Sequence, residues 1–394
     1  MKYFFVLGKN QALSLAELSS VLRGSALDYT GNGIALFDSE KEIDAEKLIR
    51  QLGGTVKIGR VEDKFGIGST DEIKQFVCDL VCRKREAASG KFKFGISQHG
   101  STNLNTKDLG MEVKTHLKDK GFSSRLVTSK EKNLSSVVVE TNKLTDKGME
   151  VVLFEANGQV MVGHTLAVQP FKDLSFRDYG RPARDSHSGM LPPKLAQILI
   201  NLAGGGKTEK KTVLDPFCGS GTILTEAALM GYKNMIGSDE SDKAVQDTQK
   251  NLEWSKEKYG LENMEYRLEN IKTEELDQFL NKESVDLVAT EPYLGPQRGK
   301  IKTGQVVREL EELYSRSLKE IARVLKKGGQ VAMVWPVFEN GTKPIDPDIG
   351  ELRILKPLPE KLGKNKKLIT TSRNTIVYSR EGQKVWREIV ILQK

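Results

Sequence analysis

The feature that most constrains the fold of this chain is a glycine-containing turn at residues 215–222, which reads Asp-Pro-Phe-Cys-Gly-Ser-Gly-Thr. A short β-branched run, Thr212 to Leu214, comes directly before it, and a helix-like run from Thr222 to Met230 follows and ends at Gly231. Glycines between a strand and a helix let the backbone come close to a ligand, as in doubly wound nucleotide-binding folds. The turn therefore predicts an open α/β sheet with a ligand beyond the end of its first strand.

The same alternation of strands and helices continues after the turn. Three further strand-like runs lie at 235–239, 286–289 and 331–334. Apolar residues repeat along one face from Leu310 to Leu325 and predict a helix that stops at Gly328-Gly329. Strands that alternate with helices predict a parallel sheet covered on both faces. Three closing strand-like runs are expected to form an antiparallel edge, at 368–372, 375–378 and 385–392.

An acidic residue, Asp239, follows twenty residues after Gly219. Asp239 ends the next strand-like run, where a carboxylate can accept hydrogen bonds from both hydroxyls of a ribose. The dinucleotide fingerprint is not matched, because its third glycine is missing and Asp215 precedes the glycines. A cationic methylsulfonium with an amino-acid tail suits this arrangement better than a pyrophosphate does. The predicted cofactor is S-adenosylmethionine, and the candidate residues for it are Asp215, Phe217, Gly219, Gly221, Thr222 and Asp239.

The second candidate site is the loop at residues 290–296, Thr-Glu-Pro-Tyr-Leu-Gly-Pro, which follows a strand-like run. Ligands of open parallel sheets bind beyond the carboxyl ends of the strands, so this loop should face the cofactor. In amino-methyltransferases the equivalent loop reads Asp/Asn-Pro-Pro-aromatic. There the acid or amide orients an exocyclic amino group, and the aromatic ring stacks on the extruded base. This chain departs from that pattern with a glutamate and a single proline.

We interpret Glu291, Pro292 and Tyr293 as the catalytic residues of this loop. Glu291 is expected to orient the amino group of the target base, and Tyr293 is expected to stack on the base. The single proline leaves open which residue stacks, since the aromatic lies one position nearer the acid than in the usual pattern. A simple turn after a buried strand is the alternative interpretation.

Two α/β segments are expected before the turn. Residues 1–65 contain strand-like runs at 3–7 and 33–37 and a helix-like run at 14–22. Residues 66–168 contain strand-like runs at 92–97, 136–140 and 150–156 and a basic helical stretch at 107–120. Residues 169–193 show no sustained periodicity and are interpreted as an ordered linker.

The positive charge of the chain is concentrated in one segment. The formal net charge is +8, and between Val81 and Lys132 twelve Lys or Arg residues stand against five Asp or Glu residues. A basic segment outside the catalytic motifs favours a domain that docks a polyanion, although each lysine taken alone is typical of an ordinary solvated surface. The candidate RNA-binding residues are Arg83, Lys84, Arg85, Lys91, Lys93, Lys114 and Lys118.

Composition argues against several classes of protein. No stretch approaches the roughly 20 consecutive apolar residues of a membrane-spanning helix, and the opening run Met1 to Gly8 is too short for a signal-peptide core and lacks a small-residue cleavage site. A cytoplasmic protein without a membrane partner is therefore expected. Three cysteines form neither a disulfide framework nor a zinc site. Cys78 and Cys82 are expected to be buried on the apolar face of a helix. The four histidines are scattered, so neither a metal site nor a histidine base is indicated.

Together, these residues resemble the THUMP-containing tRNA guanosine N2-methyltransferases, most closely the archaeal-type enzymes that modify guanosine 10. The resemblance covers nearly the whole chain. Apart from the turn and the loop, it rests on Tyr3 to Asn10, Leu13 to Leu18, Val162 to Gln169, Arg177 to Asp185 and Ser188 to Ala196.

The resemblance implies a Rossmann-like methyltransferase domain at residues 194–394, preceded by two α/β domains and a linker at 169–193. These would be a ferredoxin-like domain at 1–65 and a THUMP domain at 66–168, which in this family grips the tRNA 3′ end. The implied reaction is transfer of a methyl group from S-adenosylmethionine to the N2 amino group of a tRNA guanosine, expected to be guanosine 10. The resemblance also adds Pro192, which borders the cofactor pocket, and Asn270, which stands where the family has an acid that contacts adenine.

The sequence is also compatible with other interpretations. The charged residues between Arg177 and Asp185 are interpreted as a salt-linked hinge, with contact to RNA as the alternative. The catalytic loop alone also allows a DNA amino-methyltransferase, and its altered residues allow an RNA-binding protein that has lost activity. Absence of S-adenosylmethionine binding would identify the last case. The sequence does not decide whether a small activating subunit is required.

Overall fold

The computed structural model describes residues 1–22, 27–88, 90–184, 190–206, 210–296, 302–363, 365, 368, 370–380 and 382–394. They form two compact units. Unit 1 comprises Met1–Gln11, Gly24–Gln51 and Thr55–Phe171, and unit 2 comprises Ala12–Arg23, Leu52–Gly54 and Lys172–Lys394. Three residues of the segments that carry the family resemblance, Asp185, Ser188 and Gly189, lie outside the described residues.

Unit 1 is built on one eight-stranded sheet with the strand order β2-β3-β1-β4-β8-β7-β5-β6. The strands are β1 (Lys2–Leu7), β2 (Leu27–Tyr29), β3 (Ile34–Asp38), β4 (Thr55–Gly66), β5 (Phe92–His99), β6 (Ser124–Val127), β7 (Gly148–Ala156) and β8 (Gln159–Val168). Strand β4 pairs with β1 on one side and β8 on the other, so residues on both sides of the expected boundary at 65 share this sheet. The division into a ferredoxin-like and a THUMP domain stays a prediction.

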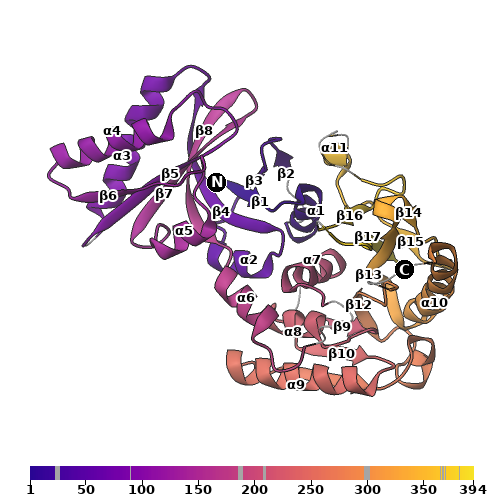
Figure 1. Cartoon of the computed structure of the whole chain (residues 1–394). Helices are drawn as coiled ribbons and strands as arrows, with labels where there is room; N and C mark the ends of the chain where they lie inside the picture. Colours follow the sequence, from indigo (N-terminus) through magenta and orange to yellow (C-terminus); the bar gives the residue numbers. More distant parts are fainter. Residues whose placement is uncertain are drawn as a thin grey trace. The chain divides into compact units, whose positions relative to one another are not determined.

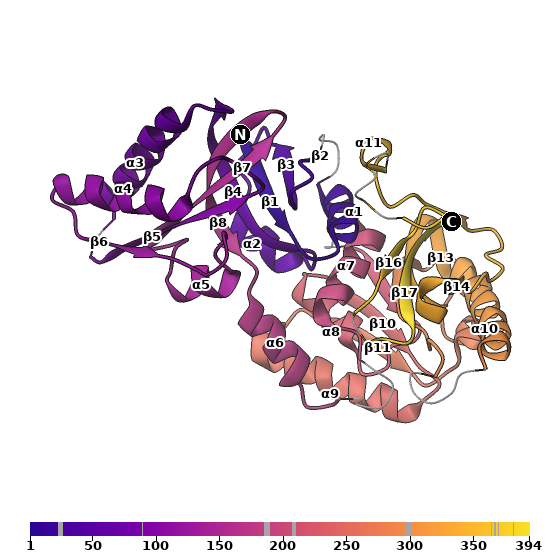
Figure 2. The same ribbon diagram turned by 45° about the horizontal axis from the view of Figure 1, so that its top comes forward.

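Four helices belong to unit 1, namely α2 (Ala45–Gln51), α3 (Thr70–Glu86), α4 (Thr106–Asp119) and α5 (Ser136–Thr141). In both views α3 and α4 lie side by side against the sheet (Figures 1 and 2). Their apolar faces pack on Phe92, Phe94 and Ile96, the alternate residues of β5. Cys78 and Cys82 belong to this core, as the helical spacing predicted.

The strand predicted at residues 136–140 is wrong, because these residues form helix α5. The Ser135 hydroxyl accepts a hydrogen bond from the backbone N–H of Val138 at 3.3 Å and so caps the start of the helix. Of the three consecutive valines, only Val139 is fully buried, against Val127, Leu134 and Leu144. The cap and the single buried position in this turn outweigh the strand preference of β-branched residues.

Unit 2 contains a nine-stranded sheet in which seven strands follow the order β11-β10-β9-β12-β13-β17-β15. Its strands are β9 (Thr212–Asp215), β10 (Asn234–Ser238), β11 (Glu265–Glu269), β12 (Val285–Thr290), β13 (Leu325–Phe338), β14 (Lys343–Pro344), β15 (Arg353–Ile354), β16 (Ile376–Tyr378) and β17 (Trp386–Gln393). Strands β9 to β13 pair in parallel, and β17 pairs antiparallel with β13, which confirms the predicted parallel sheet with an antiparallel edge.

The helices of unit 2 are α6 (Phe171–Tyr179), α7 (Pro193–Gly204), α8 (Thr222–Leu229), α9 (Asp242–Tyr259), α10 (Thr303–Val324) and α11 (Glu360–Gly363), with 3-10 turns at Thr273–Gln278 and Glu339–Gly341. In both views α10 lies across the sheet from α7 and α8 (Figures 1 and 2). Helix α6 lies in the segment interpreted as a linker. Helix α10 ends at Val324, and residues 325–338, including the two glycines, belong to β13.

Two of the three predicted closing strands are present as β16 and β17. The described part of the third, at 368–372, contains no strand. Thr371 N–H donates to Thr375 O at 2.9 Å, and Asn374 has a φ of 60°, so the chain turns here and returns along β16.

Unit 2 also includes most of an N-terminal helix, α1 (Gln11–Val21). The carboxylate of Glu17 is fully buried there. It accepts hydrogen bonds from the backbone N–H groups of Gly53 and Gly54, at 2.9 and 2.8 Å, and from Nδ2 of Asn201 on α7 at 2.8 Å. Burial raises the pKa of Glu17 to about 7. A buried carboxylate with neutral partners thus joins three segments that are far apart in the sequence.

Candidate functional site

The candidate site lies where the strand order of unit 2 changes direction. Strand β9 pairs with β10 on one side and with β12 on the other, so the chain leaves β9 toward one half of the sheet and returns in the other half. Such a point opens a crevice beyond the carboxyl ends of the two strands. Asp215 ends β9, Thr290 ends β12, and the Thr290 hydroxyl donates to Asp215 Oδ1 at 2.7 Å.

The glycine turn after β9 closes over the end of β10. Gly219 has a φ of 53°, and a Cβ at this position would have no atom within 4 Å, so its backbone borders open space. Its N–H donates to Asp239 Oδ2 at 3.0 Å, and the N–H of Ser241 donates to Oδ1 at 3.0 Å. Thr248 on α9 donates to Gly219 O at 2.8 Å. The turn and the Asp239 carboxylate are therefore held in fixed positions.

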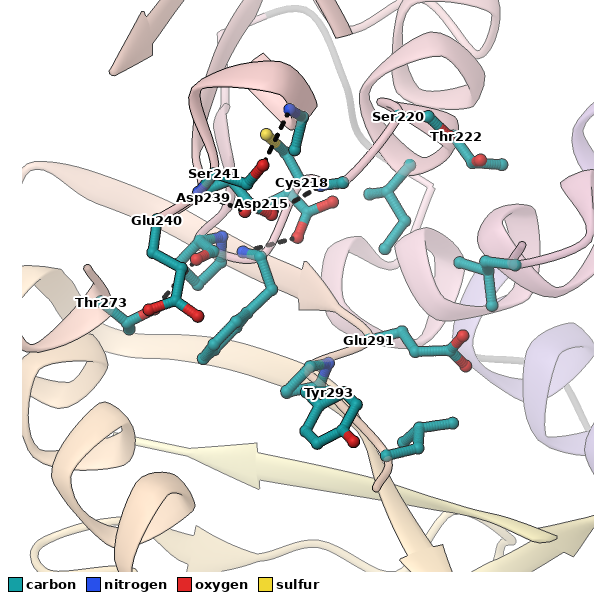
Figure 3. Close-up of a pocket in the computed structure, with 18 of the residues that line it drawn as sticks. Asp215, Cys218, Ser220, Thr222, Asp239, Glu240, Ser241, Thr273, Glu291 and Tyr293 are labelled. Atoms are coloured by element: carbon teal, nitrogen blue, oxygen red, sulfur yellow. Dashed lines mark hydrogen bonds between the residues drawn. The ribbon is translucent and has the colours of Figure 1, made fainter. Parts of the chain in front are cut away.

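A pocket of about 430 Å³ opens at this point, a size typical of small-molecule sites. Figure 3 shows Asp215 and Asp239 at the turn and Glu291 and Tyr293 on the loop that leaves β12. The predicted site residues that line it are Asp215, Phe217, Gly219, Thr222, Asp239, Glu291, Pro292 and Tyr293. Two segments predicted independently from the sequence, the glycine turn and the 290–296 loop, thus meet in one pocket.

Three predicted cofactor residues lie outside this lining. Gly221 caps the start of α8 with a φ of 77°. Asn270 is exposed and donates through Nδ2 to the backbone oxygen of Asp239 at 2.9 Å. Pro192 precedes α7, while its neighbours Met190 and Leu191 line the pocket. The roles predicted for these three residues stay predictions.

Asp215 is a buried carboxyl group in the wall of the pocket. Both of its hydrogen bonds, from Thr290 Oγ1 and from Phe217 N–H at 3.3 Å, go to Oδ1. Burial is the main influence on this group and raises the pKa of Asp215 to about 7, with smaller contributions from the charges of Asp239 and Glu291. A cationic ligand group in the pocket would compensate for these neighbouring carboxylates.

The 290–296 loop is fixed from two sides. The Glu291 carboxylate forms a two-pronged ion pair with Arg387 on β17, with Nε to Oε2 at 2.6 Å and Nη2 to Oε1 at 3.0 Å. The hydroxyl of buried Tyr314 on α10 lies 3.2 Å from the backbone oxygen of Tyr293. The Tyr293 side chain itself is 58% exposed, so its ring is available to a partner at the mouth of the pocket.

Arg387 is a site residue that sequence reasoning missed. Its side chain is 8% exposed, and although burial lowers its pKa, the hydrogen bonds and charge of Glu291, with smaller contributions from Tyr378 and Tyr314, bring the pKa of Arg387 above the ordinary value. The available signal was the Arg-Glu pair at the start of an otherwise apolar closing strand. Charged residues inside such a strand usually have buried partners.

Two further arginines connect α6 and the segment after it to α8. Arg177 on α6 pairs with Glu226 on α8 at 2.7 Å and with Asp173, which agrees with the interpretation of this segment as salt-linked. Arg181 is 5% exposed and donates to Thr222 Oγ1 at 2.6 Å and to Met190 Sδ at 3.0 Å. Its Nε has no hydrogen-bond partner among the described residues, and burial lowers the pKa of this arginine. Arg181 thus supports two residues that line the pocket, Thr222 and Met190, from behind.

The candidate RNA-binding residues lie in unit 1 and only partly gather. Arg83, Lys84 and Arg85 form the last turn of α3, and Lys114 and Lys118 lie on the neighbouring α4. Lys91 is exposed just before β5. Lys93 alternates with buried Phe92 and Phe94 on β5, so it points to the opposite face of the sheet, where it donates to Asn142 at 3.1 Å.

Unit 1 contains a hollow of its own, and it is lined by lysines that sequence reasoning did not single out. It measures about 440 Å³ and lies beyond the carboxyl ends of the parallel strands β5 and β6. Lys107, Lys130 and Lys132 line it together with the start of α4. Individual lysines of a basic segment carry no signal in the sequence that distinguishes them from their neighbours.

Among the described residues, no cluster of three or more His, Cys, Asp or Glu side chains is arranged to hold a metal ion. In the same part of the chain, no helix combines the length and apolar character needed to cross a membrane.

Two family profiles match the chain. The family described as "RMKL-like, methyltransferase domain" matches residues 181–343, which include the glycine turn, Asp239 and the 290–296 loop. A family described as "DNA methylase" matches residues 89–250. The first profile therefore covers both segments that meet in the pocket.

Curated relatives match shorter stretches. A tRNA (guanine(10)-N2)-dimethyltransferase of Methanothermobacter thermautotrophicus is 33% identical over 152 residues, which cover 39% of this chain and 40% of the relative. A probable tRNA (guanine(10)-N2)-dimethyltransferase of Methanothermococcus thermolithotrophicus is 34% identical over 139 residues, which cover 34% of this chain and 75% of that protein. The chain thus spans less than half the length of the first relative.

A solved structure extends the likeness of the fold to the whole chain. TrmN from Thermus thermophilus superposes with a TM-score of 0.53 at 17% identity, and the match covers 100% of both chains.

Proposed function

This chain belongs to the family of the tRNA (guanine(10)-N2)-dimethyltransferases, and we propose that it transfers a methyl group from S-adenosylmethionine to the exocyclic N2 amino group of a guanosine in tRNA, with guanosine 10 as the expected position. The observation that carries the proposal is the pocket in which the glycine turn, Asp239 and the 290–296 loop meet beyond β9 and β12. The match of residues 89–250 to a DNA methylase profile, which ends before the 290–296 loop, gives DNA as the alternative substrate.

The residues of the pocket fit S-adenosylmethionine. Asp239 is fixed by two backbone N–H groups and keeps further lone pairs for the two hydroxyls of a ribose. Asp215 offers a carboxylate to an ammonium group. The open space beside Gly219 lets the turn approach a ligand closely. The ammonium group of an amino-acid tail thus has an opposite charge at the pocket.

S-adenosylmethionine supplies a methyl group on a positively charged sulfur, which needs no further activation. The protein's task is then to bring an amino group of low nucleophilicity into line and to stabilise the positive charge that develops on its nitrogen. Glu291 is suited to accept the protons of that amino group, and the exposed ring of Tyr293 is suited to stack on the base. The product can lose its proton to water or to Glu291, so no histidine base is required.

Unit 1 is proposed to dock the tRNA. Its support is the basic end of α3 and α4 and the lysine-lined hollow beyond β5 and β6. Cationic side chains on one unit attract a polyanion irrespective of its sequence and leave the choice of base to the pocket. In this proposal, residues 1–65 form a ferredoxin-like domain and residues 66–168 a THUMP domain, residues 169–193 are the linker, and residues 194–394 form the methyltransferase. The proposal also places the protein in the cytoplasm, where a tRNA substrate is available.

The test uses the full chain, S-adenosylmethionine and an unmodified tRNA transcript, followed by mass spectrometry of the nucleosides. We expect N2-methylated guanosine that disappears when guanosine 10 is replaced by adenosine. A duplex DNA of equal length is the matched competitor, and methylated DNA bases in place of methylated guanosine would contradict the proposal. Tyr293→Phe should keep activity and Tyr293→Ala should lose it, because stacking needs the ring and not the hydroxyl.

A further inference from the structure

Arg387 occupies a position where an arginine is costly. It lies near the start of β17, opposite Pro336 of β13 and Tyr378 of β16, and its side chain is 8% exposed. Removing a guanidinium from water costs several kcal/mol unless its donors are satisfied by a partner of good geometry. Within the described residues, the hydrogen bonds of Arg387 go to Glu291 alone, from Nε and Nη2. The arginine is therefore matched to one carboxylate.

That carboxylate is in the proposed catalytic loop. Glu291 is 11% exposed and lines the pocket beside Asp215. An ionised carboxylate has about four lone-pair positions, and Arg387 uses two of them. Two positions stay available, which equals the number of protons on an exocyclic amino group. Glu291 is thus equipped to accept hydrogen bonds with an orientation that the protein has already fixed.

The arrangement also accounts for the unusual sequence of the loop. A glutamate has one more rotatable bond than the aspartate of the usual Asp-Pro-Pro-aromatic loop, and a free glutamate would lose more side-chain entropy on orienting the substrate. Only one proline, Pro292, stands between the acid and the aromatic residue to stiffen the backbone there. A planar guanidinium that holds both carboxylate oxygens removes this freedom, which a lysine ammonium does not do. The longer acid and the buried arginine are therefore complementary changes.

We propose that Arg387 is a positioning residue for methyl transfer: its guanidinium holds the Glu291 carboxylate in the orientation that receives the amino group of the target base. The inference rests on the proposed function of the pocket. It adds a residue from the antiparallel edge of the sheet to a site otherwise built from the ends of parallel strands. Tyr314 on helix α10 holds the backbone of the same loop through the carbonyl oxygen of Tyr293.

The test compares two substitutions of Arg387 in the full chain. Arg387→Lys keeps the charge and loses the two-pronged geometry, and Arg387→Met keeps most of the volume and loses the charge. We expect the single-turnover rate at saturating tRNA and S-adenosylmethionine to fall at least tenfold in Arg387→Lys and further in Arg387→Met. The affinity for S-adenosylhomocysteine, measured by calorimetry, should stay within about threefold of the wild type, because Arg387 does not line the pocket.

The matched control is Arg373, which pairs with Glu388, the next residue of β17, at 2.8 Å. Arg373→Lys disturbs a comparable ion pair in the same edge of the sheet and should lower the thermal midpoint without the loss of rate. Methylguanidinium added to an Arg387→Ala variant should restore part of the rate, since it can occupy the vacated space beside Glu291. A purely structural arginine would not show such rescue at unchanged thermal midpoint.

The outcomes separate this inference from the function on which it rests. A wild-type chain that methylates tRNA, with Arg387 variants of equal rate, would overturn the role of Arg387 and leave the function standing. Loss of rate strictly parallel to loss of S-adenosylhomocysteine affinity and thermal midpoint would also overturn it. A wild-type chain that methylates no tRNA would remove the function itself, and the inference with it.

Discussion

The hydroxyl of Thr290 donates to Asp215 Oδ1 at 2.7 Å and so joins the carboxyl ends of β12 and β9. This bond places the first residue of the glycine turn at a fixed distance from the catalytic loop. Asp215 is thus a buried acid between the glycine turn, proposed to bind the cofactor, and the loop proposed to bind the base. Burial raises the pKa of Asp215 to about 7. Ligand binding in this pocket should therefore depend on pH near neutrality.

The affinity for S-adenosylhomocysteine should rise with pH. The ligand's ammonium group favours ionised Asp215, and with a pKa of about 7 this form increases from a minor to the major species between pH 6 and pH 8. We expect the dissociation constant at pH 6 to be about tenfold higher than at pH 8, measured by calorimetry. Asp215→Asn should bind more weakly and show no such slope. An identical slope in the variant would assign the titration to another group.

Asp239 and Glu291 should have separable roles. Asp239→Ala removes an acceptor for the ribose hydroxyls and should weaken S-adenosylhomocysteine binding by about 10- to 100-fold. Asp242→Ala, a nearby exposed acid at the start of α9, is the control and should change little. If Asp242→Ala weakened binding equally, a general effect of charge would replace the proposed contact.

For Glu291 the informative substitution is Gln. Alanine would leave buried Arg387 with neither a counter-ion nor a hydrogen-bond acceptor, a loss that typically costs 3–5 kcal/mol and confuses stability with catalysis, whereas glutamine removes the charge but keeps one side-chain acceptor for the guanidinium. Glu291→Gln should lower turnover by about 100-fold with S-adenosylhomocysteine affinity nearly unchanged. Equal losses of cofactor affinity in Glu291→Gln and Asp239→Ala would contradict this division of roles.

Glu17 should make the stability of the protein decrease as pH rises. Its pKa is raised by burial from 4.5 to about 7, so the folded state binds the proton more tightly than the unfolded state does. Its stabilising contribution is complete below pH 4.5 and is lost as pH rises through about 7. The difference in free energy of unfolding between the wild type and Glu17→Gln should fall by up to about 3 kcal/mol over this range. Urea titrations at several pH values measure it, and a constant difference would refute it.

The basic end of α3 and α4 should contribute to tRNA affinity. Reversing two exposed charges, Lys114→Glu with Lys118→Glu, should weaken tRNA binding at least tenfold and lower the slope of log affinity against log salt by about two. Cofactor affinity should not change. The control reverses two exposed lysines of the same unit, Lys41 and Lys47. Equal weakening in both double variants would indicate a general charge effect and not a docking site.

The local motifs of the site could be predicted from the sequence, and their long-range partners could not. The strand, glycine turn and helix at 212–230 are contiguous, and the acid at the end of the next strand follows at a distance set by one helix. Arg387 lies 96 residues after Glu291, and their pairing depends on β17 entering the sheet beside β13. A single sequence has no periodic signal for such a contact.

Local propensity also failed where side-chain burial decides the conformation. Residues 136–140 contain three valines and favour a strand, yet the Ser135 cap and the packing of Val139 form a helix. The basic residues of unit 1 were also only partly predictable. Their number can be counted in the sequence, but the sequence does not show on which face of the sheet each one lies. Lys93 points away from helix α4, which carries Lys114 and Lys118.

Helix α1 has a consequence for any attempt to isolate the methyltransferase. Residues 12–22 and 52–54 belong to unit 2, and among the described residues the hydrogen-bond partners of Glu17 come from that unit. A fragment that starts at residue 169 would expose the surface of α7 that normally receives this helix and would leave Asn201 without Glu17. No single cut in the polypeptide separates the two units, because the catalytic unit takes segments from both sides of residues 24–51 and 55–171.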